Sequence, residues 1–132
     1  ADHAGQYGVP LFFEPLNRYE TNFVNNVEAA LKFVALADSN NIRILCDLFH
    51  MNIEERDIAE ALRRAGKMVG HVHLADSNRR AAGGGHTDFG PIARALREIG
   101  YEGFVSAEAM AGPGRAEEAA RMTMEAFGKY FA

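Results

Sequence analysis

The sequence predicts an α/β protein made of four consecutive βα units, which is half of a (β/α)8 (TIM) barrel. Short apolar runs near residues 9–14, 42–47, 69–74 and 104–108 alternate with longer segments of helical periodicity. Strands that are separated by helices pair in parallel through right-handed crossovers. No GxGxxG turn follows the first run, which disfavours the dinucleotide-binding doubly wound sheet. Half a barrel is therefore the fold that we expect.

Each expected strand leads into an amphipathic helix. The first helical pattern covers residues 23–39. The second covers residues 54–65, is reached through a loop and is closed by Gly66, a typical residue just past a helix. The third follows a Gly-rich loop and covers residues 91–99, with a proline in its first turn and a glycine after its last. A final helix is expected over residues 116–131.

Composition limits the class of protein. With 132 residues, 48% of them apolar, we expect residues 1–132 to form a single domain. The net charge of −4, with scattered lysines and arginines, disfavours a nucleic-acid partner, which needs clustered cations. No apolar run approaches the roughly 20 residues of a membrane span, and no secretory signal is evident. The single cysteine, Cys46, lies in an apolar run, typical of a buried thiol, and we expect a cytoplasmic protein.

A side chain that can bind a metal stands at the carboxyl end of every expected strand. These side chains are Glu14, Asp47, His73 and Glu108. In parallel βα folds the carboxyl ends of the strands form the active site. Three carboxylates and one imidazole suit Mn²⁺, Mg²⁺ or Co²⁺ better than structural zinc. Any one of these acids is as readily an ordinary solvated residue, so the prediction depends on all four occurring together.

A second layer of side chains is expected beneath these four. Side chains alternate across a strand, so residues two positions earlier point the same way. These residues are Phe12, Leu45, His71 and Ser106. They can form a floor under a metal.

Two further residues lie in positions typical of ligand binding. His50 follows Asp47 by three residues, on the expected βα loop, and Arg79 follows His73 by six. An arginine there offers paired donors to hydroxyl or carbonyl oxygens. The plainer interpretations are a histidine that caps the next helix and, for Arg79 with its neighbour Arg80, a solvated basic pair.

Four segments resemble the ketose 3-epimerases of the D-tagatose/D-psicose 3-epimerase type, within the xylose isomerase-like TIM barrels. In chain order they are FEPLNRYE at 13–20, DLFHMN at 47–52, HLADSNR at 73–79 and SAE at 106–108. Their order and spacing agree with the family, and the Asn-Arg-Tyr-Glu stretch is the most specific part. The chain is similar to the C-terminal half of the family, in which four further βα units come first.

The resemblance implies one divalent metal, Mn²⁺ ahead of Mg²⁺ or Co²⁺, and a small-molecule sugar substrate. The metal ligands it implies are Glu14, Asp47, His73 and Glu108. The acid/base pair it implies is Glu14 and Glu108. The residues it implies for the oxygens at the C1–C3 end of the sugar are Glu20, His50 and Arg79.

The implied activity is epimerisation of a ketose by proton transfer at the carbon next to the carbonyl, through an enediolate. Carboxylates from two strands can act as base on one face of that carbon and acid on the other. A hydroxypyruvate-type aldose–ketose isomerase would use the same groups. An endonuclease of the endonuclease IV type needs additional histidines, and here His86 and Asp88 come in the wrong order. A catalytically incomplete half-barrel fragment is the remaining alternative.

Half a barrel leaves two unpaired edge strands and an apolar inner wall. The chain also does not begin with Met. We therefore expect it to pair with its missing N-terminal half or with a second copy, as a two-fold homodimer of half barrels.

Overall fold

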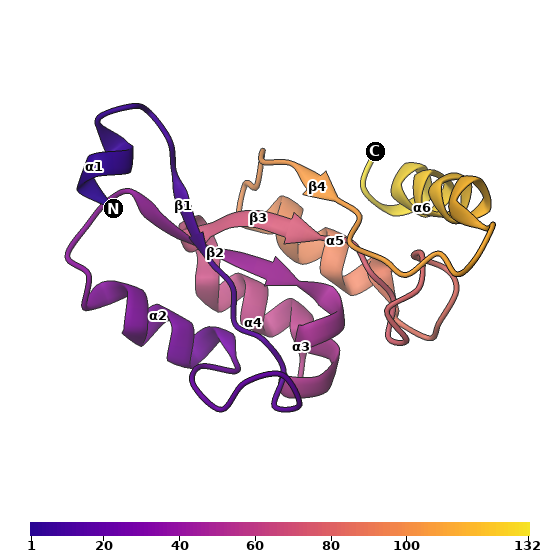
Figure 1. Cartoon of the computed structure of the whole chain (residues 1–132), viewed down its shortest axis with the longest axis horizontal. Coiled ribbons are helices and arrows are strands. Elements are labelled where there is room, and N and C mark those ends of the chain that lie inside the picture. The colour runs from indigo at the N-terminus through magenta and orange to yellow at the C-terminus, as the bar shows by residue number, and fades with distance from the viewer.

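One parallel sheet organises the molecule, in the order β1–β2–β3–β4 (Figure 1). The computed structural model describes all 132 residues. The strands are β1 (Leu11–Phe13), β2 (Ile42–Asp47), β3 (Val69–His73) and β4 (Val105–Ser106). The expected α/β class with four parallel strands is confirmed. Only β2 has the expected length; the other three are shorter, and Glu14 and Glu108 lie just past strands rather than within them.

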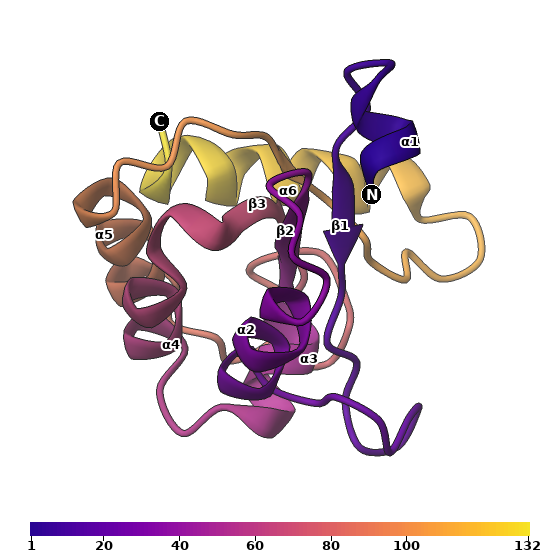
Figure 2. The same ribbon diagram turned by 90° about the vertical axis from the view of Figure 1, so that its left-hand side faces the viewer.

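Helices pack against one another along the sheet in chain order, α2 on α4, α4 on α5 and α5 on α6. They are α1 (Asp2–Gly5), α2 (Val27–Ala35), α3 (Leu48–Glu54), α4 (Ile58–Ala65), the 3₁₀ helix η1 (Gly66–Met68), α5 (Phe89–Glu98) and α6 (Ala116–Tyr130). Figure 1 shows α2 and α4 on one side of the sheet, and Figure 2 shows the same layers after a quarter turn. None of the helices is long and apolar enough to cross a bilayer.

The two faces of the sheet differ in burial. Ile44, Cys46 and Val72 are at most 1% exposed and belong to the core shared with the helices. On the other face Phe12 is 42% exposed, and Leu45 is only partly buried. The sheet is therefore packed on one face and open on the other, as the inner wall of a partial barrel would be.

The second helix of the sequence prediction is wrong at its start. No loop follows β2, because α3 begins directly after Asp47, whose Oδ1 accepts hydrogen bonds from the backbone N–H groups of Phe49 and His50. The helix then stops, and α4 starts anew at the side-chain cap of Asp57. An aspartate in the N-cap position satisfies the free N–H groups of a first turn, which explains both starts.

Other boundaries moved by a few residues. A helix was expected over residues 23–39, but the observed helix, α2, is shorter at both ends. It starts after Asn26, whose side chain caps it. The short helix α1 was not expected. Gly66 closes α4 at φ +53°, a left-handed conformation that favours glycine, so this predicted cap is confirmed.

A bulge shifts the register between β2 and β3. Ile44 pairs with Val69 and Leu45 with His71, so Gly70 is the extra residue. A Cβ on Gly70 would lie 2.4 Å from the Arg43 Cβ and 2.6 Å from the Phe12 ring. Only glycine fits here, and the bulge sets the level at which His71 and His73 face the open side.

Candidate metal centre

The four strand-end side chains converge on one point. One ligand atom from each of Glu14, Asp47, His73 and Glu108 lies within 4.8 Å of all the others. His73 Nδ1 is 3.2 Å from Asp47 Oδ2 and 3.3 Å from Glu108 Oε2. The parallel register produces this, because it brings the carboxyl ends of β2, β3 and β4 to the same edge.

One carboxylate oxygen of Glu14 lacks a hydrogen-bond donor in this cluster. Its Oε1 is buried and has no hydrogen-bond partner. Burial raises the pKa of Glu14, the negative charge of Asp47 raises it further, and His73 opposes both. A buried carboxylate oxygen without a donor carries a free-energy penalty that a cation would remove, so the residues present fit a divalent metal.

Asp47 has two separate roles for its two oxygens. Oδ1 caps α3, as described above, and Oδ2 faces His73. The residue is 1% exposed. The cap therefore fixes the carboxylate so that its second oxygen points into the cluster.

The expected floor beneath the cluster is present. His71 Nε2 lies 2.7 Å from Ser106 Oγ, and the His71 ring stacks on Phe12 at a centroid distance of 5.8 Å. The rings of His71 and His73 meet edge to face at 5.3 Å. The His71–Ser106 contact links β3 to the short strand β4 directly below the four clustered side chains.

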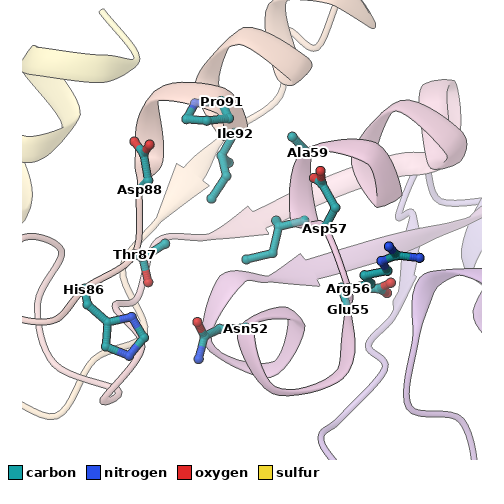
Figure 3. Close-up of a pocket in the computed structure, with 11 residues that line it drawn as sticks. Asn52, Glu55, Arg56, Asp57, Ala59, His86, Thr87, Asp88, Pro91 and Ile92 are labelled. Atoms are coloured by element: carbon teal, nitrogen blue, oxygen red, sulfur yellow. The ribbon is translucent and has the colours of Figure 1, made fainter.

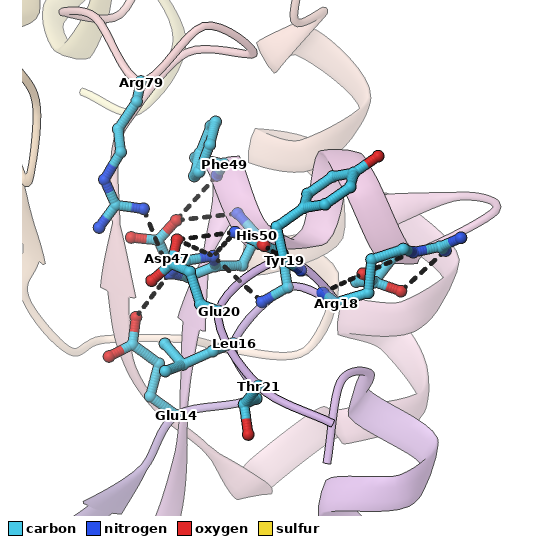
Figure 4. Close-up of polar contacts among 12 residues, drawn as sticks. Glu14, Leu16, Arg18, Tyr19, Glu20, Thr21, Asp47, Phe49, His50 and Arg79 are labelled. Atoms are coloured by element: carbon cyan, nitrogen blue, oxygen red, sulfur yellow. Dashed lines mark hydrogen bonds and ion pairs between the residues drawn. The ribbon is translucent and has the colours of Figure 1, made fainter. Parts of the chain in front are cut away.

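Glu20, His50 and Arg79 lie beside the cluster (Figure 4). His50 does not cap a helix from a loop; it is 1% exposed in the first turn of α3, with Nε2 3.6 Å from Glu14 Oε1. Burial lowers the pKa of His50. Arg79 donates to Glu108 Oε2 at 2.9 Å and lies over the Phe49 ring at 4.8 Å, so it is not a freely solvated arginine.

Two buried residues that the sequence analysis passed over organise the loops around the cluster. Asn17, 2% exposed, binds both Glu20 and His50. Asp76, fully buried, accepts hydrogen bonds from the backbone N–H groups of Ser77, Gly83 and Thr87. Burial alone would raise the pKa of Asp76, but hydrogen bonds from the backbone N–H groups of Thr87, Ser77 and Gly85 outweigh it and the pKa is lowered. Both residues lie inside the motifs at 13–20 and 73–79, and this was the only sequence signal that could have pointed to them. A buried polar side chain in a loop needs several hydrogen-bond partners.

A hollow of about 340 Å³ lies outside the four-residue cluster, between the starts of α4 and α5 (Figure 3). Arg56 and Asp57 line it from the start of α4, and His86 and Asp88 line it from the start of α5. His86 and Asp88 do not join the four-residue cluster. The extra ligands that a multi-metal endonuclease centre needs are therefore not assembled beside it.

Comparison with known proteins assigns the family. Residues 1–127 match the family described as xylose isomerase-like TIM barrel, and the chain belongs to that family. It is 42% identical to the D-psicose 3-epimerase of Agrobacterium fabrum over 108 residues, and 37% identical to the 3-dehydro-D-guloside 4-epimerase of Escherichia coli over 118 residues. These alignments cover 82% and 89% of this chain, and 37% and 44% of those relatives.

The fold is similar to that of a sugar complex. The structure of D-psicose 3-epimerase with D-tagatose from Clostridium cellulolyticum H10 superposes with a TM-score of 0.87 at 32% identity. The superposition covers 97% of this chain and 50% of that one. The chain thus spans about half the length of this enzyme and less than half of the two curated relatives above.

Proposed function

We propose that this chain carries the metal centre and the proton-transfer residues of a sugar epimerase that acts on a ketose. One observation carries the proposal: four potential ligands at or just past the ends of four consecutive strands meet within 4.8 Å, and one of them has a buried oxygen without a partner. The epimerases among the relatives support the reaction class.

The proposed ligands are Glu14, Asp47, His73 and Glu108, and Mn²⁺ is the ion we expect. A divalent cation held there would supply Lewis-acid stabilisation of the negative charge that develops next to a sugar carbonyl. Three carboxylates and one imidazole are a donor set for such an ion. Burial raises the pKa of Glu14, and the negative charges of Asp47 and Glu108 raise it further, a cost that such an ion would remove.

Glu14 and Glu108 are the proposed proton-transfer pair. One carboxylate removes the proton from the carbon beside the carbonyl, and the electron pair of that C–H bond moves into an enediolate. The other carboxyl group, in its protonated form, returns a proton to the opposite face, which inverts the centre. The two residues follow the first and last strands, so they reach the cluster from opposite edges of the sheet.

Glu20, His50 and Arg79 are the proposed sugar-binding residues. They lie next to the cluster and offer both acceptors and donors to hydroxyl oxygens. Arg79 is held by Glu108 and Phe49, which presents its guanidinium in a fixed orientation.

Calorimetric titration with Mn²⁺, Mg²⁺ and Co²⁺ tests the metal centre on this chain directly. We expect one cation per chain, with binding weakened in Glu14→Gln and Glu108→Gln. Glu117→Gln, on the surface of α6 and outside the cluster, is the matched control. Cation binding that is the same in all four proteins would contradict the assignment.

Proton exchange in deuterated water tests the reaction. The chain, alone and joined to the N-terminal half of a D-psicose 3-epimerase, is incubated with Mn²⁺ and a ketohexose or hydroxypyruvate. We expect deuterium at the carbon next to the ketohexose carbonyl and none after either Gln substitution. Exchange into hydroxypyruvate alone would favour the aldose–ketose isomerase. Substantial activity in either variant would contradict the acid/base assignment.

We also propose that the open sheet pairs with a second half barrel. β1 and β4 each have one unpaired edge, and Leu11 and Phe12 on β1 are 40% and 42% exposed. Two copies related by a two-fold axis along the barrel would place β1 of each beside β4 of the other and complete eight strands. Light scattering should then give the mass of a dimer, and a stable monomer would contradict this pairing.

A further inference from the structure

Asn17 has every side-chain polar group occupied. Its Oδ1 accepts the backbone N–H of Tyr19 at 2.9 Å, which fixes the orientation of the amide. The Nδ2 group, which bears two protons, faces Glu20 Oε1 at 2.9 Å and His50 Nδ1 at 2.8 Å. With 2% exposure, this side chain sits in one orientation behind two proposed sugar-binding residues.

The surroundings of His50 define where its proton is. Two donors point at Nδ1, the Nδ2 amide and the backbone N–H of Asn17, the latter at 3.3 Å. A nitrogen that accepts from donors carries no proton, so the neutral ring carries its proton on Nε2. The opposite tautomer would set three N–H groups against one another in a buried space.

The protonated nitrogen faces the metal centre. Nε2 of His50 is 3.6 Å from Glu14 Oε1 and 3.2 Å from Arg79 Nη1. Arg79 is always a donor, so two N–H groups border the same space beside the cluster. An oxygen that accepts from both would relieve this arrangement, and a sugar carbonyl or hydroxyl oxygen is of that kind.

We infer that Asn17 is a positioning residue for the sugar: its backbone N–H and its side-chain amide together select the Nε2–H tautomer of His50, and the amide also holds Glu20 in place. The inference rests on the proposed function, in which His50 and Glu20 contact the substrate. The inference explains why an asparagine is buried behind His50 and Glu20: its amide donates to both of them. An aspartate of the same shape would offer Nδ1 an acceptor where a donor now stands.

Long-range ¹H–¹⁵N spectra of the histidine rings test the tautomer on this chain, with neither cation nor sugar added. The His50 signal is assigned by its loss in His50→Phe. We expect a proton-free Nδ1 and a protonated Nε2 in the wild type, and a proton on Nδ1 in Asn17→Asp. Asn17→Ala keeps the backbone donor, so its tautomer should be that of the wild type.

Asn25→Asp is the matched control, because Asn25 lies in the same loop and donates only to the backbone oxygens of Leu16 and Thr21. It should leave the His50 spectrum unchanged. A wild-type Nδ1 that bears a proton would overturn the inference, as would an unchanged tautomer in Asn17→Asp. If Asn17→Asp does not fold, the wild-type spectrum still decides the tautomer, and sugar binding by Asn17→Ala decides the positioning role.

Titration with D-fructose in the presence of Mn²⁺ tests the effect on the sugar. We expect Asn17→Ala to weaken binding about tenfold, as loss of a hydrogen bond to a charged group does, and Asn25→Ala to change it less than twofold. Equal binding in both variants would contradict the positioning role. A wild-type chain that binds cation but no sugar would count against the proposed function and leave the tautomer result standing.

Discussion

Arg79 and Glu108 hold each other across two loops: Arg79 Nη2 donates to Glu108 Oε2 at 2.9 Å, and the backbone N–H of Met110 donates to the Arg79 carbonyl at 2.7 Å. Arg79 has a φ of +57°, unusual for a residue with a side chain. These contacts stabilise that conformation, and they join the loop after β3 to the loop after β4. The guanidinium thereby borders the cluster without being a candidate ligand itself.

Arg79→Lys should weaken sugar binding about tenfold and leave the cation affinity nearly unchanged. Lysine keeps the charge but loses the planar set of donors and the stacking on Phe49. Parallel calorimetric titrations with Mn²⁺ and with D-fructose separate the two effects. A loss of cation affinity equal to the loss of sugar affinity would show that Arg79 supports the metal centre instead. Arg80→Lys, on the exposed neighbour, is the control.

Asp47→Asn should separate the two roles of this carboxylate. Asparagine caps helices as well as aspartate does, so α3 should remain and the free energy of unfolding should change by less than about 1 kcal/mol. Cation affinity should fall more than tenfold, because the charged oxygen that faces His73 is lost. Asp47→Ala should lose both the cap and the affinity. Urea unfolding and calorimetry measure the two quantities, and an Asn variant that binds cation normally would refute the role in ligation.

Acidification should release the cation in a range set by Glu14. Burial raises the pKa of this carboxyl, so protons compete with the cation at a higher pH than for an ordinary glutamate. Without cation, the raised pKa of Glu14 makes the stability of the folded chain depend on pH. The contribution of Glu14 is fully present below the unfolded pKa of 4.5, and it is lost as the pH rises through the higher pKa of the folded state. The cation-free Glu14→Gln variant should therefore be more stable than the wild type at neutral pH. Thermal unfolding at pH 4 and pH 7 measures this, and a less stable variant at pH 7 would contradict it.

Gly70→Ala should destabilise the chain by about 1–3 kcal/mol, because the added methyl group collides with Arg43 and Phe12 at the bulge. Gly128→Ala is the control, since its Cβ would meet nothing within 4 Å in the interior of α6. That substitution should stabilise by about 0.5–1 kcal/mol. Urea unfolding of both variants gives the comparison, and equal shifts would show that the bulge tolerates a side chain.

Cys46 should be unreactive in the folded chain. Burial raises the pKa of this thiol to about 12, from 9.0, and only the thiolate is nucleophilic. The folded state is favoured below pH 9.0, and this contribution is lost progressively as the pH rises toward 12. A thiol reagent at pH 8 should react only after urea is added, and Cys46→Ala should flatten part of the alkaline loss of stability. Rapid reaction without urea would contradict the burial.

The convergence of the four candidate ligands was predictable because it depends on one rule of parallel sheets. Glu14, Asp47, His73 and Glu108 were placed together once four strands and their direction were recognised, and the structure brings all four together. The floor made by His71 and its neighbours followed from alternation along the strands. Neither step needed the packing of the helices.

The features that the sequence analysis missed are those in which a single polar side chain forms hydrogen bonds to nearby backbone or side-chain groups. Asp47 starts α3 at once by capping it, so no loop separates strand from helix. Asn17 and Asp76 hold loops whose shape no periodicity describes. Short polar residues can cap, turn or bridge, and only the three-dimensional arrangement of donors decides which of these they do.

The brevity of β4 has a consequence for how tightly a cation could be held. Within the sheet only Val105 and Ser106 pair with β3, and Glu108, two residues further on with its side chain 51% exposed, is held there by contacts with Arg79. Capture of an ion by this carboxylate would have to immobilise the segment that carries it, which costs roughly 1–2 kcal/mol of backbone entropy per residue ordered. Affinity would then depend on the stiffness of this segment as well as on the donor atoms. Hydrogen exchange at residues 105–110, slowed by cation, would be its signature.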